Sequence, residues 1–85
     1  MTWTLQITGP AQKDLRKLPP KDQVRVRAAM TAMQDDPFSG DVVRLKAHPV
    51  AWRRRVGNYR ILFDVFPKKL LVVVTAILRR TSTTY

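Results

Sequence analysis

The segment from Trp52 to Phe63 constrains the fold of this chain most, because it has the pattern of a tight β-hairpin. If Gly57-Asn58 forms the two-residue turn, the register of the hairpin places Arg55 directly opposite Arg60. Side chains alternate between the two faces of a strand, so Arg53, Arg55 and Arg60 are expected on one face of the sheet. Like charges that face each other across strands lower stability by up to about 1 kcal/mol. The pattern therefore favours a negatively charged ligand between these arginines.

The rest of the chain after Val42 also has the pattern of strands, with a period of two or continuous β-branched runs. Strands are predicted near residues 42–46, 51–56, 59–66 and 70–78. Pro67-Lys68-Lys69 is expected to form the last turn. Because residues 70–78 are almost entirely apolar, this last strand is predicted to be central and buried on both faces. Arg54 and Trp52 are expected on the other face of the sheet from Arg53, Arg55 and Arg60, in structural roles.

The first part of the chain predicts one strand and two helices. Polar and apolar residues alternate from residue 2 to residue 8, which indicates a half-buried strand. A first helix is expected to begin at Gly9-Pro10 and to stop before Pro19-Pro20, where a second begins and runs to residues 35–37. The predicted fold is therefore α+β, one domain over residues 1–85. It consists of an N-terminal strand, a two-helix hairpin and an antiparallel β-meander, which together form a four- to five-stranded twisted sheet with the helices on one face.

The charge of the chain points to a polyanionic partner. Sixteen Lys and Arg oppose six acidic residues, which gives a formal net charge of +10, and ten of the sixteen are Arg. Residues 44–60 contain six basic side chains and no acid. The planar guanidinium suits phosphate, so this concentration favours a phosphate-binding site over a generally solvated surface.

Several classes of protein do not fit the composition. The chain has no cysteine and a single histidine, His48, so thiol chemistry is excluded and no metal site or cofactor is expected. The N-terminus lacks the pattern of a signal peptide, and the longest apolar run, residues 70–74, is too short to cross a bilayer. A cytoplasmic protein without membrane contact is the expectation.

The order of the predicted elements and several short motifs resemble the RelE/ParE superfamily of bacterial toxins. The motifs are the helical run from Leu15 to Pro19, the strand end Leu45-Lys46, the hairpin of residues 55–63, and Arg79-Arg80 followed by Tyr85. The resemblance covers nearly the whole chain. It implies the toxin of a type II toxin-antitoxin system.

RelE-like members of this superfamily enter the ribosomal A site and cleave the messenger RNA there without a metal. The catalytic positions that the resemblance implies are Arg53, Arg55, Arg60, Arg79 and Tyr85. Fixed guanidinium groups suit this reaction, because negative charge grows on the phosphate when the ribose 2′-OH attacks it. Further contacts to RNA or the ribosome are expected from Arg44, Lys46, Arg80, Lys13, Arg16 and Lys17. Arg79 and Arg80, at the exposed end of a hydrophobic strand, and the three residues of the first helix are alternatively solvated surface charge.

The general base of this reaction stays open. A guanidinium remains protonated, the chain has no Glu, and no Asp lies within residues 44–60. Arg53 and Arg55 stand where some relatives carry lysine, whose pKa a site can lower. The remaining candidates are Tyr85, which could instead stack on a nucleobase, and a group supplied by the ribosome.

Two other functions remain open. A ParE-like toxin shares the fold but poisons DNA gyrase and is not a nuclease, and a plain RNA-binding module would bind phosphate without cleavage. The resemblance further implies a cognate antitoxin, expected to be acidic and to fold onto the toxin, besides the ribosome and messenger RNA as partners.

Overall fold

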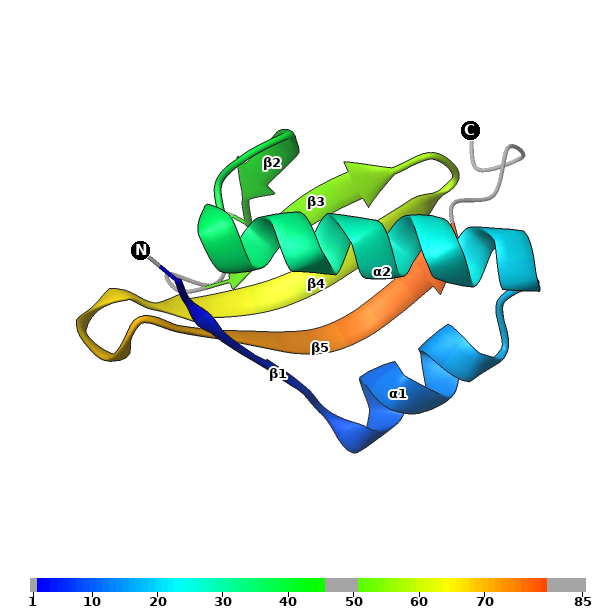
Figure 1. The fold of residues 1–85 in the computed structure, drawn as a ribbon, viewed down its shortest axis with the longest axis horizontal. Coiled ribbons are helices and arrows are strands. Elements are labelled where there is room, and N and C mark those ends of the chain that lie inside the picture. Colours follow the sequence, from blue (N-terminus) through cyan, green and yellow to red (C-terminus); the bar gives the residue numbers. More distant parts are fainter. Residues whose placement is uncertain (1, 46–50, 80–85) are drawn as a thin grey trace.

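Two helices and five strands make up the described part of the chain, residues 2–45 and 51–79 of the computed structural model (Figure 1). In chain order they are β1 (Thr4–Ile7), α1 (Gly9–Arg16), α2 (Pro20–Asp35), β2 (Asp41–Arg44), β3 (Ala51–Val56), β4 (Tyr59–Phe66) and β5 (Leu71–Arg79). A short 3₁₀ turn, Pro67–Lys69, joins β4 to β5. The predicted α+β class and order of elements are confirmed, and β3 and β4 have the predicted bounds. β2 begins one residue before its predicted position, and β5 begins one residue after its predicted position.

The strands form a mixed sheet in the order β1-β5-β4-β3-β2. From β2 to β5 the pairing is antiparallel, as the predicted meander requires. β1 pairs with β5 in parallel, from Thr4 opposite Leu71 to Ile7 opposite Val74. The two helices carry the chain from this edge of the sheet to the opposite edge, where β2 lies (Figure 1).

Prolines and caps set the ends of the helices. The Thr8 side chain accepts a hydrogen bond from the Ala11 backbone N–H at 3.3 Å and so caps the first turn of α1. Pro19 precedes α2, and Pro20 occupies its first turn, where the missing N–H has no intrahelical partner to lose. Neither helix of the described part is long and apolar enough to cross a membrane.

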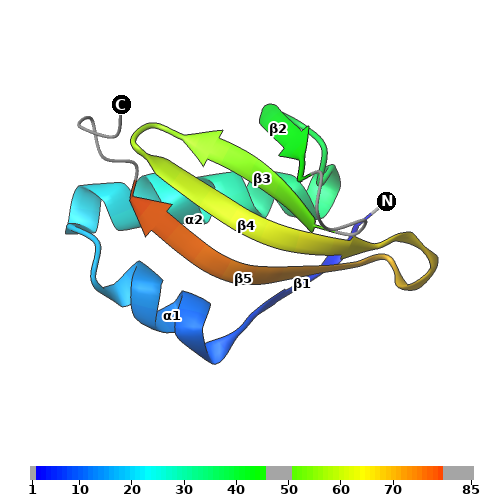
Figure 2. The same ribbon diagram turned by 180° about the vertical axis from the view of Figure 1, so that it is seen from behind.

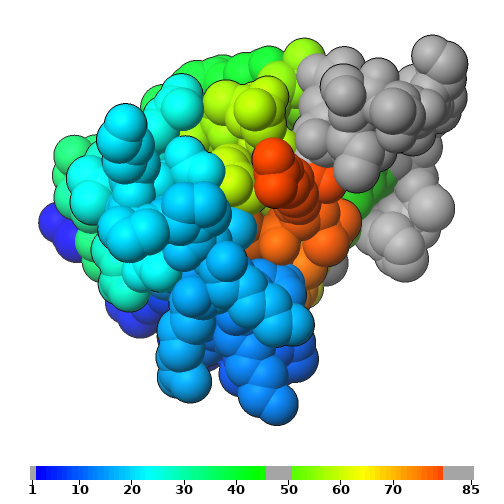
Figure 3. All heavy atoms as spheres, turned by 90° about the vertical axis from the view of Figure 1, so that its right-hand side faces the viewer, coloured from blue at the N-terminus to red at the C-terminus, as the bar shows by residue number. Residues whose placement is uncertain are grey.

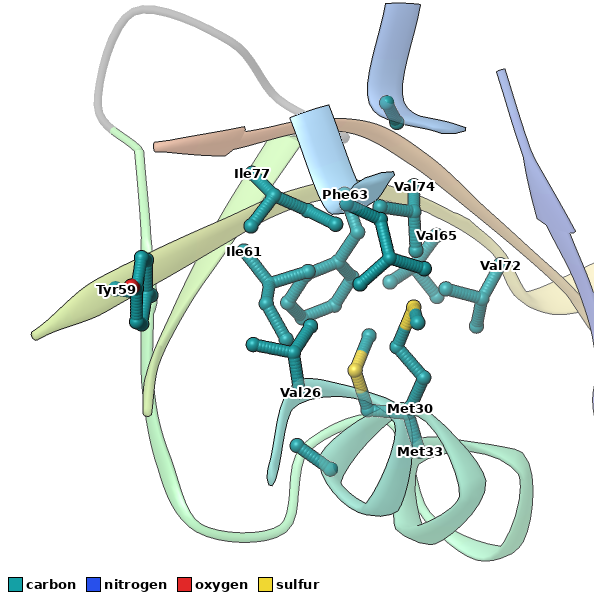
Figure 4. Close-up of a cluster of buried hydrophobic side chains, with 13 residues drawn as sticks. Val26, Met30, Met33, Tyr59, Ile61, Phe63, Val65, Val72, Val74 and Ile77 are labelled. Atoms are coloured by element: carbon teal, nitrogen blue, oxygen red, sulfur yellow. The ribbon is translucent and has the colours of Figure 1, made fainter. Parts of the chain in front are cut away.

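The core lies between the helices and one face of the sheet (Figure 4). Its residues from the helices are Ala11, Leu15, Val26, Ala29, Met30 and Met33, and those from the sheet are Tyr59, Ile61, Phe63, Val65, Val72, Val74 and Ile77. The α2 members recur at helical spacing, so α2 presents one apolar stripe to the strands. Both helices therefore cover the same face, as predicted.

α1 also completes the edge of the sheet where β1 ends. β1 pairs with β5 only as far as Val74, so the edge of β5 beyond this point has no neighbouring strand in the described part. There Asp14 of α1 accepts a hydrogen bond from the Ile77 backbone N–H at 3.0 Å, and the Thr8 hydroxyl donates to the Thr75 carbonyl at 3.3 Å. These contacts satisfy strand groups that would otherwise need water or another strand.

The opposite face of the sheet carries no helix of the described part (Figure 2). On β5, Val72, Val74 and Ile77 are buried against the helices, whereas Leu71 and Val73 are half-buried and Leu78 is 46% exposed. The prediction that the last strand is buried on both faces is therefore wrong. Its apolar run reflects a central position in the sheet, but both helices pack on the same side. We call this second side the uncovered face.

Candidate nucleic-acid interface

The predicted hairpin is present with the predicted register. Arg55 lies opposite Arg60, and Gly57-Asn58 is the turn between β3 and β4. Gly57 has φ +56°, whereas Asn58 has no positive φ, which is the pattern of a type II′ turn with glycine first. This turn leaves no free choice of register, and hence fixes which side chains share a face.

Three arginines lie together on the uncovered face: Arg53 and Arg55 of β3 and Arg60 of β4, here called the arginine face. The Arg53 side chain is 14% exposed and that of Arg55 38%. Arg53 Nη1, Arg55 Nε and Arg60 Nε are each buried without a hydrogen-bond partner in the described part, as is Arg54 Nε on the other side of the sheet. Buried N–H donors without acceptors are unfavourable, so an oxyanion that these side chains turn to meet would satisfy them.

Asp41 is the acidic residue that the sequence reasoning missed. It lies opposite Arg55 where β2 pairs with β3, on the same side of the sheet as the three arginines. Its carboxylate oxygens lie 3.9 Å from Arg53 Nη2 and 3.8 Å from Arg55 Nε. No acid occurs within residues 44–60, but strand pairing brings this one to the arginines from outside that block. The only signal in the sequence is that Asp41 directly precedes a predicted strand.

Arg79 lies on the other side of the sheet from the arginine face. It is opposite Tyr59, whose ring is buried on the helix side, and it is exposed at the end of β5. The reason is a β-bulge: Leu62 pairs with Ala76 but Phe63 pairs with Val74, so Thr75 is an extra residue on β5. One extra residue reverses the faces of all that follow it. Figure 3 shows the end of β5, in orange-red, beside the hairpin and α2.

The other predicted site residues in the described part of the chain do not join the arginine face. Lys13 and Arg16 belong to α1, and Lys17 caps its C-terminus; all three side chains are exposed on the helix layer. Arg44 lies opposite Trp52 and is exposed on the edge strand β2. Three further predicted site residues lie outside the described residues: Lys46, Arg80 and Tyr85.

Arg54 and Trp52 point away from the arginine face, as predicted. Arg54 Nη1 donates to Ser39 Oγ at 3.3 Å, and its guanidinium lies over Gly40, where a Cβ would come within 3.0 Å of Nη2. Trp52 packs edge-to-face on Phe38 with ring centroids 4.8 Å apart. Both residues therefore hold the loop between α2 and β2 against the sheet, which positions Asp41.

A second polar cluster joins α2 to the hairpin turn. The Tyr59 hydroxyl donates to Asp22 Oδ2 at 2.6 Å, and the Arg25 guanidinium lies against Gly57. The Asp22 carboxylate that accepts this hydrogen bond, together with burial of the phenol, raises the pKa of Tyr59. Arg25 and Arg79 oppose this rise because their positive charges favour the phenolate. The cluster fastens the tip of the hairpin to the helix layer.

Residues 5–83 match the family model of the ParE toxin of the type II toxin-antitoxin system parDE. Toxin RelE1 of Methanocaldococcus jannaschii is 25% identical over 83 residues, which are 94% of this chain and 92% of that protein.

Solved RelE structures have the same fold. The RelBE2 toxin-antitoxin complex of Mycobacterium tuberculosis contains a chain with TM-score 0.82 and 25% identity, covering 94% of this chain and all of that one. The RelE-RelB complex of Pyrococcus horikoshii gives TM-score 0.84 at 23% identity, covering 98% of this chain and 100% of that one. Isolated Escherichia coli RelE gives TM-score 0.82 at 18% identity, covering 96% of this chain and 88% of that one. The family match, the shared fold and the basic hairpin together place this chain in the ParE toxin family of type II toxin-antitoxin systems, within the RelE/ParE superfamily.

Proposed function

We propose that this RelE-like toxin is a ribosome-dependent endoribonuclease, which cleaves messenger RNA in the ribosomal A site and so inhibits translation. The arginine face is the observation that carries the proposal. Two of its arginines oppose each other directly across the hairpin, and three of its buried N–H groups have no acceptor in the described part. A phosphodiester would supply acceptor oxygens to these donors and relieve the repulsion between the two guanidinium groups.

The reaction is attack of a ribose 2′-oxygen on the adjacent phosphate, with no metal required. Arg53 and Arg55 would hold the phosphate from β3, and Arg60 would bind the developing negative charge from β4. The roles of Arg79 and Tyr85 are taken from the resemblance to RelE-like toxins. Because Arg79 lies on the other side of the sheet, it would reach the RNA only around the end of β5.

The proposed partners are the ribosome with its messenger RNA and a cognate antitoxin. Two of the similar structures, from Mycobacterium tuberculosis and Pyrococcus horikoshii, are RelE-RelB complexes, which supports an antitoxin for this chain. The net charge of +10 favours an acidic antitoxin segment that folds onto the toxin. Basic residues outside the arginine face would add contacts to ribosomal RNA: Arg44, Lys46, Arg80, Lys13, Arg16 and Lys17.

Primer extension on a defined messenger RNA tests the proposal. Purified protein is incubated with naked RNA and with ribosomes programmed with the same RNA and an empty A site. Cuts that appear only with ribosomes are the expected result. Cleavage of naked RNA would overturn the ribosome dependence, and the absence of cuts in both reactions would overturn the nuclease function.

A ParE-like gyrase poison is the second candidate, and two observations favour it. The matching family model describes the ParE toxin, and the predicted catalytic Arg79 does not lie with the arginine face. A supercoiling assay with purified gyrase separates the two functions. Inhibition of gyrase without RNA cleavage would establish this second function, whereas unaffected supercoiling together with A-site cuts would exclude it.

A further inference from the structure

Asp41 is an acidic side chain placed among groups that otherwise suit only an anion. Each of its carboxylate oxygens faces a different guanidinium, Oδ1 toward Arg53 and Oδ2 toward Arg55. Arg60 stands across the hairpin from Arg55 on the same face. The carboxylate therefore lies beside the position that a bound phosphate would take.

A purely structural ion pair explains this arrangement poorly. The two N···O distances of 3.8 and 3.9 Å are longer than a charge-assisted hydrogen bond, and the Asp41 side chain is 53% exposed. Pairs of this kind contribute little to stability. Arg55 Nε has no hydrogen-bond partner in the described part although Asp41 is its neighbour. The guanidinium groups thus keep free donors, and the carboxylate keeps free lone pairs.

The proposed reaction needs a base at this position. The 2′-oxygen is adjacent to the phosphate that it attacks, so a group that takes its proton must lie beside the phosphate-binding guanidinium groups. The arginines remain protonated and accept no proton. In the described part, Asp41 is the carboxylate that forms ion pairs with the arginine face.

We propose that Asp41 is the general base of RNA cleavage, an inference that rests on the nuclease function proposed above. One carboxylate oxygen takes the proton of the ribose 2′-OH as the bond from O2′ to phosphorus forms. The bond from phosphorus to the 5′-oxygen breaks, which leaves a 2′,3′-cyclic phosphate and a 5′-oxygen that takes a proton from water. Asp41 then returns its proton to solvent. Arg53, Arg55 and Arg60 balance the charges of the carboxylate and the phosphate throughout.

The test uses the primer-extension assay with programmed ribosomes. D41N keeps the size of the side chain but removes the base, so its cleavage rate should fall about 10²- to 10⁴-fold. Its binding to programmed ribosomes should be unchanged or tighter, because a negative charge beside the phosphate is removed. D41E, which restores a carboxylate on a longer stem, should recover part of the rate.

Asp64 provides the matched control. It lies on the same uncovered face, opposite Ala51, and forms no ion pair in the described part. D64N should therefore cleave at the wild-type rate, and the thermal unfolding of both asparagine variants should match that of the wild type.

The outcomes separate the two proposals. If the wild type cuts and D41N cuts at the same rate, Asp41 is a counter-ion of the arginines and the inference is wrong, while the nuclease function stands. If D41N loses activity only because it no longer binds ribosomes, the inference is also wrong. If the wild type cuts nothing, the proposed function fails and this inference fails with it.

Discussion

Arg55 and Arg60 carry like charges at directly opposed positions of β3 and β4. A fold selected for stability alone would not place them so, because cross-strand repulsion weakens a sheet. In the described part, Asp41 forms ion pairs with Arg55 and Arg53 but not with Arg60, and these pairs are long and half-exposed and therefore weak. The arginine face therefore contributes to binding and little to stability. Substitutions there should affect the reaction much more than the fold.

Arg60→Gln tests this separation. Removing the positive charge should slow A-site cleavage by about 10²- to 10³-fold, the usual effect of losing one donor to a developing oxyanion. The free energy of unfolding should stay unchanged or rise by up to about 1 kcal/mol, because the cross-strand repulsion disappears. Urea unfolding and primer extension measure the two effects, with Arg27→Gln on the helix side as the matched control. Full cleavage by Arg60→Gln would contradict its assigned role.

Tyr59→Phe tests the cluster that joins α2 to the hairpin. The pKa of Tyr59 is raised in the folded protein, so its protonated hydroxyl stabilises the fold fully below the unfolded value of about 10. This contribution is lost as the pH rises through the raised folded pKa. The wild type should therefore be more stable than Tyr59→Phe at pH 8, and the difference should shrink above pH 10. Chemical denaturation at both pH values measures it, and an equal difference at both would show that the hydroxyl contributes no pH-dependent stability.

At the scale of elements, contacts from the helices complete the edge of the sheet at β5 and the tip of the hairpin. β1 is shorter than β5. Beyond the end of β1, Asp14 of α1 accepts the hydrogen bond of a β5 backbone N–H in place of a strand. The hairpin tip is fastened in a comparable way, because Tyr59 and the turn glycine meet Asp22 and Arg25 of α2. The helices therefore cover the core and also bind the edge of β5 and the tip of the hairpin that carries the arginines.

Asp14→Ala should destabilise the protein by about 1 to 3 kcal/mol, because the Ile77 N–H loses its acceptor. Asp14→Asn keeps an acceptor oxygen and should retain most of the stability. Urea unfolding gives the free energies, and hydrogen exchange of the Ile77 amide reports the local contact. Equal stability of the alanine and asparagine variants would show that this hydrogen bond does not matter.

At the scale of the whole molecule, the sheet has one face for folding and one for binding. The helix side holds the fully buried residues, whereas the uncovered face holds half-buried apolar residues and the arginine face. This division explains how an 85-residue chain with a net charge of +10 keeps its core free of charged residues: no charged side chain of the described part is buried. Mutations on the two faces should have clearly different effects on stability.

Phe63→Ala and Leu78→Ala compare the two faces. Phe63 is fully buried against the helices, so its truncation should cost about 3 to 5 kcal/mol through lost burial and a cavity. Leu78 lies opposite Arg60 on the uncovered face and is 46% exposed, so its truncation should cost less than about 1 kcal/mol. Urea unfolding of both variants measures the contrast. A similar loss in both would mean that the uncovered face is packed as tightly as the core.

Local signals in the sequence determined the elements and the centre of the candidate site. The two-residue turn at Gly57-Asn58 fixes the register of β3 and β4, so Arg53, Arg55 and Arg60 are predictable as neighbours without further knowledge of the fold. Prolines and caps mark both helices for the same reason: the interactions that they control lie within a few residues along the chain.

Only the tertiary structure decided which distant residues join that centre. Asp41 reaches the arginines through the pairing of β2 with β3, and Arg79 is turned away from them by the extra residue Thr75. A strand that is apolar on both faces shows no period of two, so its sequence carries no record of a bulge that reverses its faces. Pairing between separate strands depends on how the whole sheet packs against the helices, and no short stretch of sequence contains that information.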